Sequence, residues 1–127
     1  MDIKFGTDGW RGIMARDFTF ENVRRVAQAI AEYVKNLPPK ARGGGKVIVG
    51  YDRRFQSDAF AYELARVLQG NGLKPILFEE ALPTPAVSWL TQKEKALGVM
   101  VTASHNPPSF NGIKIKMEGR EIGRAHV

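Results

Sequence analysis

The sequence predicts an α/β fold, a three-layer α/β/α domain whose mostly parallel mixed sheet has four to five strands. One observation and one general rule lead to this prediction. Short apolar runs alternate along the chain with longer segments whose apolar residues recur at helical spacing. Consecutive strands separated by helices pair in parallel, because the chain must cross back over the sheet between them. The 127 residues provide one domain with a substantial core.

The clearest helix signal covers residues 17–37. Thr19 is a good N-cap, and Phe18 and Val23 stand at the two positions of a hydrophobic staple. Pro38 and Pro39 end the helix. The apolar positions form one continuous stripe, which comprises Val23, Val26, Ala27, Ile30, Tyr33, Val34 and Leu37.

A strand, a helix and a second strand are expected next. Residues 46–51 (KVIVGY) form a short run with β-branched residues, typical of a buried strand. Ser57 is predicted to cap a helix that ends at residues 70–72 (GNG). The strand over residues 73–78 contains Pro75, which lacks a backbone N–H and therefore favours an edge position.

The last elements carry clear signals as well. Thr84 and Pro85 fit the N-cap and first turn of a third helix. Residues 97–102 (LGVMVT) are predicted to form another buried strand. In residues 113–117 (IKIKM) apolar side chains alternate with lysines, which indicates a strand with one face toward water.

Composition excludes several classes of protein. The chain has no cysteine, so disulfides, thiolate catalysis and zinc–thiolate sites are excluded and a cytoplasmic location is expected. No apolar run approaches the ~20 residues of a membrane span, and no secretory signal is expected at the N-terminus. We therefore predict no membrane partner.

The net charge of +6 is the one unusual bulk property. It fits an anionic partner, such as nucleic acid or a phosphorylated metabolite, or a fragment separated from a more acidic remainder. No basic run is longer than two residues. We therefore expect no nucleic-acid partner, and keep a basic nucleic-acid-binding domain as the less favoured alternative.

The segment over residues 102–112 (TASHNPPSFNG) has unusual content for a connector. It follows a buried strand, and ligands of α/β sheets bind beyond the carboxyl ends of the strands. Its prolines and its Asn-Gly pair stiffen the backbone. Ser104 beside His105 could be a nucleophile with an acid–base group. Alternatively, both are polar loop residues that bond the local backbone.

This loop resembles the phosphoserine loop of the α-D-phosphohexomutases, which include phosphoglucomutase, phosphomannomutase and phosphoglucosamine mutase. The likeness rests on TASHNPP followed by NGIK. Three further segments are similar to motifs of the same superfamily: residues 5–12 (FGTDGWRG), 50–57 (GYDRRFQS) and 82–85 (LPTP). The four motifs occur in the family's order and cover residues 3 to about 118.

The resemblance implies an isomerase, an intramolecular phosphotransferase that moves phosphate between C1 and C6 of a hexose phosphate through a bisphosphate. Ser104 would carry the phosphoryl group. His105 and Lys114 align with residues that move protons on and off the sugar hydroxyls, and Arg11 aligns with an arginine near the phosphoserine. A phosphoserine carries about −1.5 to −2 charges, which calls for nearby cations.

The resemblance also implies partners. Mg²⁺ would bind the phosphate on Ser104, with aspartate ligands that this chain lacks, and a hexose bisphosphate would be activator and intermediate. Domains II to IV of the same protein would complete the site, so residues 1–127 alone are expected to be inactive. Whether the hexose phosphate derives from glucose, mannose or glucosamine is left open. The rival interpretation is a non-catalytic phosphosugar-binding module.

Residues 1–120 are accordingly interpreted as domain I, the phosphoserine domain. Residues 121–127 (EIGRAHV) match the translation of a sequencing adaptor. We therefore expect the natural sequence to end near Arg120, and we exclude the tail from the fold prediction.

Overall fold

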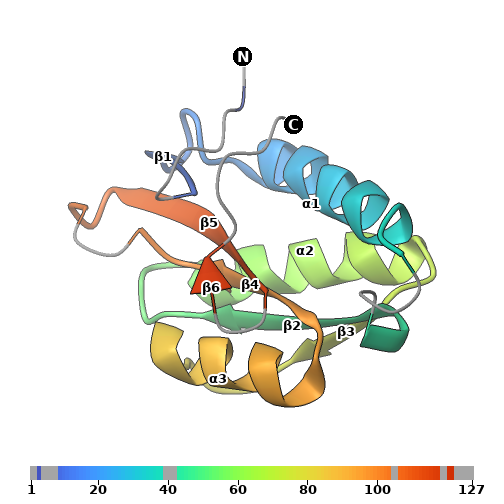
Figure 1. Cartoon of the computed structure of the whole chain (residues 1–127). Coiled ribbons are helices and arrows are strands. Elements are labelled where there is room, and N and C mark those ends of the chain that lie inside the picture. Colours follow the sequence, from blue (N-terminus) through green and yellow to red (C-terminus); the bar gives the residue numbers. More distant parts are fainter. Residues whose placement is uncertain (1–2, 4–8, 39–42, 104–105, 118–119, 122–127) are drawn as a thin grey trace.

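A mixed β-sheet with helices on both faces forms the domain (Figure 1). The computed structural model describes residues 3, 9–38, 43–103, 106–117 and 120–121. The order of strands and helices agrees with the predicted α/β class. In chain order the elements are β1 (Trp10–Ile13), α1 (Phe20–Lys35), the 3₁₀ turn η2 (Gly43–Gly45), β2 (Lys46–Tyr51), α2 (Ser57–Gly70), β3 (Lys74–Leu77), α3 (Thr84–Glu94), β4 (Leu97–Val101), β5 (Phe110–Met117) and β6 (Arg120–Glu121).

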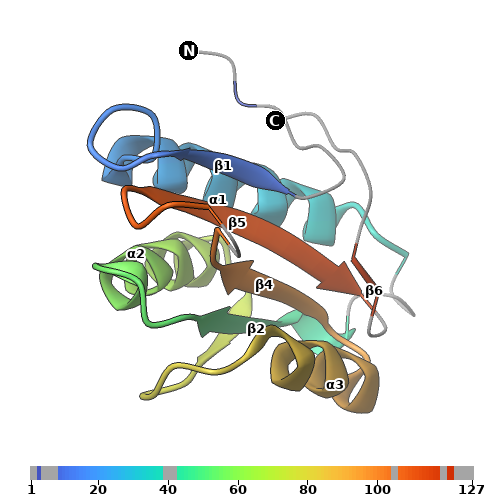
Figure 2. The same ribbon diagram turned by 90° about the vertical axis from the view of Figure 1, so that its left-hand side faces the viewer.

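The strands lie in the order β1-β5-β4-β2-β3, and the short β6 pairs with β5. Figure 2 shows β1, β5, β4 and β2 side by side. β2 is parallel to β3 and β4, whereas β5 is antiparallel to β1, β4 and β6. Among the described strands only β5 thus runs against the others, which confirms the mostly parallel mixed sheet. β3 is an edge strand, as Pro75 indicated.

Two hydrophobic cores lie on the two faces of the sheet. Helices α1 and α2 cover one face and α3 covers the other (Figures 1 and 2). Val47 and Val49 of β2 belong to the larger core under α1 and α2, and Ile48 belongs to the smaller core under α3. Successive side chains of a strand point to opposite faces, so this short apolar run serves both cores. The three-layer architecture is therefore confirmed.

Helix α1 begins as the sequence predicts. The Thr19 side chain accepts a hydrogen bond from the backbone N–H of Asn22 (3.1 Å). Phe18 and Val23, the staple pair, are fully buried. The apolar stripe is narrower than expected, because Tyr33 is 42% exposed. Its buried members pack toward α2 and the sheet.

The predicted cap of α2 is wrong. Gln56 occupies the N-cap position in the left-handed conformation (φ 61°), and Ser57 is the first helical residue. The Ser57 hydroxyl donates to the Asp52 carboxylate (2.7 Å) and accepts from the Asn111 side-chain amide (2.9 Å). Contacts with distant segments therefore engage the hydroxyl that was expected to cap the helix.

In α3 the predicted cap is displaced by one position. The N-cap is Pro83, and Thr84 is the first residue of the helix.

The prediction that one face of β5 lies in water is also wrong. Lys116 is only 9% exposed and Lys114 is half-buried. Lys116 pairs with Gly98 of β4, and a Cβ added at Gly98 would lie 2.3 Å from the Thr91 methyl of α3. Helix α3 therefore packs directly on this face and covers it near Lys116.

One expectation concerns a segment that the structure describes only in part. Of the proposed foreign tail, Glu121 pairs with Lys116 as part of β6, and residues 122–127 lie outside the described residues. The tail thus stays a prediction.

None of the helices that the structure describes is long and apolar enough to cross a membrane.

Candidate active site

The connections from β2 and β4 diverge at one point of the sheet. The two strands are neighbours, but the chain continues from β2 to β3 on one side and from β4 to β5 on the other. In α/β sheets the carboxyl ends of strands at such a switch point form a crevice where ligands bind. The residues that follow these strand ends are 52–56 and 102–109, so the topology points to the loop that the sequence singled out.

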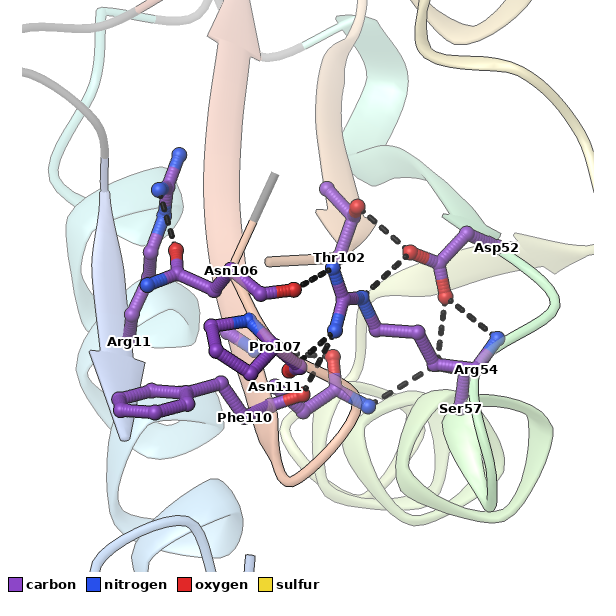
Figure 3. A network of polar contacts seen from close by, with 10 residues as sticks. Arg11, Asp52, Arg54, Ser57, Thr102, Asn106, Pro107, Phe110 and Asn111 are labelled. Carbon is purple, nitrogen blue, oxygen red and sulfur yellow. Dashed lines mark hydrogen bonds and ion pairs between the residues drawn. The ribbon is translucent and has the colours of Figure 1, made fainter. Parts of the chain in front are cut away.

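The Asp52 carboxylate joins three segments at this point (Figure 3). It accepts hydrogen bonds from the Thr102 hydroxyl (2.6 Å), the Ser57 hydroxyl (2.7 Å) and the backbone N–H of Arg54 (3.0 Å). Its own backbone N–H donates to the Val101 carbonyl (3.1 Å). The end of β2, the start of α2 and the end of β4 are thereby tied to a single carboxylate.

The guanidinium group of Arg54 binds the loop backbone directly. It donates to the carbonyl oxygens of Asn106 (2.7 Å), Pro107 (2.8 Å) and Phe110 (3.2 Å). Its Nε lies 3.5 Å from the Asp52 carboxylate, and its side chain is 14% exposed. In Figure 3 Arg54 lies between Asp52 and these three carbonyl groups.

The loop also has internal hydrogen bonds. The backbone N–H of Asn106 donates to the Ala103 carbonyl (3.0 Å), and that of Thr102 donates to the Gly112 carbonyl (2.9 Å). The buried Asn111 side chain donates to the Ser57 hydroxyl (2.9 Å). The two ends of the loop are therefore joined to each other, and Asn111 joins the loop to the start of α2.

Arg11 reaches the same loop from β1. One guanidinium nitrogen donates to the side-chain oxygen of Asn106. The Nε atom is buried and has no hydrogen-bond partner among the described residues. An unpaired buried donor costs about 1–3 kcal/mol, so an acceptor that reached this Nε atom would be stabilised there.

Gly112 allows β1 to lie this close. It pairs with Arg11 across the β1–β5 ladder. A Cβ at this position would lie 2.4 Å from the Trp10 carbonyl oxygen, 2.8 Å from the Thr102 carbonyl oxygen and 2.9 Å from Cγ of Arg11. Only a residue without a side chain lets these three groups meet.

The side chains of Arg11 and Lys114 lie on the same face of the sheet. Trp10 and Ile113 pair with each other and belong to the larger core. Because side chains alternate along each strand, Arg11 and Lys114 lie on the opposite face, as diagonal neighbours across the ladder. Such neighbours are about 7–8 Å apart, which allows two long side chains to reach one common group.

Comparison with known proteins shows the family. Residues 2–127 match the family model described as phosphoglucomutase/phosphomannomutase, alpha/beta/alpha domain I. The chain belongs to this family. It is 42% identical over 118 residues to a phosphoglucosamine mutase of Thermotoga maritima, an alignment that covers 93% of this chain and 25% of that protein.

Solved structures of the phosphoglucomutase/phosphomannomutase family have the same fold. A crystal structure of a protein from Thermus thermophilus, assigned as a phosphomannomutase, matches with a TM-score of 0.87 and 45% identity over 96% of this chain and 27% of that one. A family protein from Burkholderia thailandensis matches with a TM-score of 0.75 and 26% identity, covering 91% of this chain and 26% of that one. The chain thus spans about a quarter of the length of these relatives.

For this domain I chain the structure brings together two of the four predicted site residues. Arg11 and Lys114 share a face next to the loop after β4. Ser104 and His105 lie outside the described residues, and their flanking neighbours Ala103 and Asn106 bond to each other. The roles given to all four residues stay predictions.

Asp52 and Arg54 are the site residues that the sequence did not assign. Both belong to a segment that resembles a family motif, GYDRRFQS, yet no role was given to either. The available signal was their place, directly after a buried strand whose carboxyl end borders the predicted site.

Tyr51, the last residue of β2, has a supporting role. Burial raises the pKa of its phenol, and the carboxylates of Asp58, Glu80 and Glu79 raise it further. The neutral phenol donates to the Phe78 carbonyl (2.9 Å). It thereby ties the end of β2 to the segment after β3.

Proposed function

We propose that this chain is the nucleophile domain of a phosphohexomutase and that Ser104 carries the phosphoryl group in transit. The substrate class is a hexose monophosphate, and the reaction moves its phosphate between C1 and C6. Family membership supports the reaction class. The observation that carries the proposal at the level of atoms is the unpaired, buried Nε of Arg11.

A phosphate on Ser104 would provide the acceptor that this donor lacks. Ser104 stands two residues before Asn106, the residue that already holds the other side of the Arg11 guanidinium. Arginine binds phosphate through parallel N–H donors, and its charge favours the dianion. Lys114 lies on the same face, and its side chain makes no hydrogen bond or ion pair with the residues that the structure describes. Two cations are thus available for about −1.5 to −2 phosphate charges.

The proposed transfer balances in two steps. A hydroxyl of the sugar phosphate attacks phosphorus, the bond from phosphorus to Ser104 Oγ breaks, and the hydroxyl proton passes to a base, Lys114 or His105. The bisphosphate then turns over, Ser104 Oγ attacks its other phosphoryl group, and the base gives its proton to the sugar oxygen whose bond to phosphorus breaks. Arg11 offsets the phosphate charge throughout, and positioning supplies most of the rate.

The described residues do not form a metal site. No group of three or more His, Cys, Asp and Glu side chains that could hold a metal ion occurs in the described ranges. The Mg²⁺ of the proposal would therefore contact the phosphate on Ser104 and take its other ligands from elsewhere in a longer protein. No step above depends on it. A hexose bisphosphate would prime Ser104.

Phosphopeptide mapping tests the proposal. The protein is isolated from its native host under conditions that preserve phosphoserine, and intact mass and peptide fragmentation locate the modification. We expect phosphate on Ser104, absent in Ser104→Ala and retained in the control Ser109→Ala, which alters an exposed residue of the same loop. Phosphate on Ser109 or Thr102 with Ser104 unmodified would overturn the assignment. Complete absence of phosphate would favour a phosphosugar-binding module.

A further inference from the structure

We infer that Arg54 is a positioning residue that holds the loop after β4 in one geometry, and that the Arg11 donor meets the group on Ser104 only while it does so. This inference rests on the proposed function for its catalytic meaning. Its structural part, the control of loop geometry by Arg54, concerns residues 106–110 and stands on their contacts alone.

One guanidinium group holds three backbone carbonyls of the loop. The carbonyl oxygens of Asn106, Pro107 and Phe110 lie 2.7, 2.8 and 3.2 Å from the terminal nitrogens of Arg54. The Pro107 and Phe110 carbonyl groups belong to a turn in which the Phe110 N–H donates to the Pro107 carbonyl (2.9 Å), and Asn106 directly precedes this turn. Three acceptors around one rigid planar donor group fix the distances among the acceptors as well as their distance from the scaffold.

Asp52 fixes the guanidinium in turn. Its carboxylate lies 3.5 Å from Nε of Arg54 and accepts the Thr102 hydroxyl at 2.6 Å and the Ser57 hydroxyl at 2.7 Å. Arg54 therefore cannot move away from β2 without disturbing the start of the loop at Thr102. We call this unit, Asp52 and Arg54 with the three carbonyl groups, the loop clamp.

The loop clamp acts on Arg11 through one residue. The backbone carbonyl of Asn106 accepts a hydrogen bond from Arg54, and its side-chain oxygen accepts one from Arg11. A shift of Asn106 would therefore change the position of the Arg11 guanidinium. Since displacements of about 1 Å can cost roughly 100-fold in rate, fixing Asn106 matters for a transfer at Ser104.

Lysine cannot replace this arginine. A lysine ammonium is a compact point charge on a flexible stem and cannot span three separated carbonyls as the planar guanidinium does. Arg54→Lys thus keeps the positive charge beside Asp52 and removes the fixed geometry. The adjacent Arg53 is exposed, so Arg53→Lys is a matched control that makes the same chemical change one residue away.

The first measurement is backbone amide hydrogen exchange on the 127-residue chain. In Arg54→Lys we expect the Asn106 and Phe110 amides to exchange roughly tenfold faster or more, whereas the Val99 amide in β4 keeps its rate. Arg53→Lys should match the wild type at all three positions. Unchanged loop exchange in Arg54→Lys, or an equal increase at Val99, would overturn the inference, because Arg54 would then be a bystander or a general stability residue.

The second measurement reports on the group at Ser104. Chains are synthesised with phosphoserine at position 104, and the second ionisation of the phosphate is followed by ³¹P NMR against pH. In the wild-type background, contact with Arg11 should hold this pKa below its ordinary value of about 6. In Arg54→Lys it should return toward about 6, and in Arg53→Lys it should stay low. A pKa that remains equally low in Arg54→Lys would overturn the link from Arg54 to Arg11.

The two measurements separate the two proposals. An ordinary phosphate pKa in the wild-type background would count against the proposed phosphoserine site and against the link from Arg54 to the group on Ser104. The exchange result would still decide whether Arg54 controls the loop.

Discussion

Lys114 connects the half-buried face of β5 to the proposed proton transfer. It lies two residues beyond Gly112, on the same face as Arg11, and its stem packs near Gly9, where an added Cβ would lie 3.1 Å from Cγ of Lys114. Its ammonium group has no hydrogen-bond or ion-pair partner among the residues that the structure describes. These surroundings suit a group that meets a partner only when substrate binds.

We expect Lys114→Ala, in a complete protein that carries this domain, to reduce turnover far more than stability. Loss of a proton-transfer group should lower kcat roughly 10²–10⁴-fold, whereas the free energy of unfolding should fall by about 1 kcal/mol or less. Steady-state kinetics and urea unfolding measure the two effects. Lys74→Ala, an exposed change on β3, is the control, and near-normal turnover of Lys114→Ala would make Lys114 a bystander.

For single residues, the sequence predicts the features that depend on local patterns and misses those that depend on distant contacts. The alternation in residues 113–117 correctly places Lys114 away from the larger core. The surroundings of Arg53 and Arg54 cannot be distinguished in this way, because both follow the same strand. Arg54 is sheltered only because carbonyl groups 52 to 56 positions further along the chain surround it.

At the scale of elements, the close approach of β1, β5 and the loop depends on Gly112. We expect Gly112→Ala to lower the free energy of unfolding by about 2–3 kcal/mol, because the new Cβ would collide with backbone oxygens on both sides. Gly70→Ala, at the end of α2, meets nothing within 4 Å and should raise it by about 0.5 kcal/mol. Urea unfolding of the two variants measures both values. Equal effects would show that β1 and the loop can separate without cost.

The contact between Tyr51 and the segment after β3 makes the stability of the domain depend on pH in the alkaline range. The folded chain holds the pKa of Tyr51 above its usual value, mainly through burial. Above pH ~10 the unfolded chain therefore binds fewer protons than the folded one, and stability falls as the pH rises. Below that pH the contribution is fully present.

We expect Tyr51→Phe to remove this part of the pH dependence. At neutral pH the variant should lose about 1 kcal/mol, because the Phe78 carbonyl loses its donor. Urea unfolding at about pH 8 and about pH 11 measures the difference. Tyr62→Phe, which alters an exposed phenol, should keep the wild-type slope; a wild-type slope in Tyr51→Phe would assign the alkaline effect to other groups.

The order of elements was predictable because each carries its own local signal. The stripe of α1, the β-branched run of β2 and Pro75 of β3 act within a few residues, and the structure agrees with each of them except for the exposed Tyr33 of the stripe. The failures at Ser57 and Lys116 have a common physical cause. Ser57 bonds Asp52 and Asn111, and Lys116 lies near α3, so tertiary contacts override the local rule.

At the scale of the whole molecule, the chain offers about a quarter of the length of its relatives. We expect residues 1–127 alone to show no mutase turnover on glucose 1-phosphate or mannose 1-phosphate. Groups that hold the sugar in line with Ser104 would come from elsewhere, and positioning accounts for roughly 7–11 kcal/mol of a barrier. A coupled assay on folded chain with magnesium and hexose bisphosphate measures this. Sustained turnover would contradict the proposed division of labour among domains.

The two edges of the sheet determine how readily a strand of a neighbouring molecule can pair with the domain. One edge is β3, four residues long with a proline that offers no N–H, and the other is shared by the four-residue β1 and the two-residue β6. Short edge strands, and strands that contain a proline, are poor templates for a strand from a neighbouring molecule. This arrangement disfavours edge-to-edge association of sheets through backbone hydrogen bonds. A fibril built by strand addition would therefore require the sheet to open first.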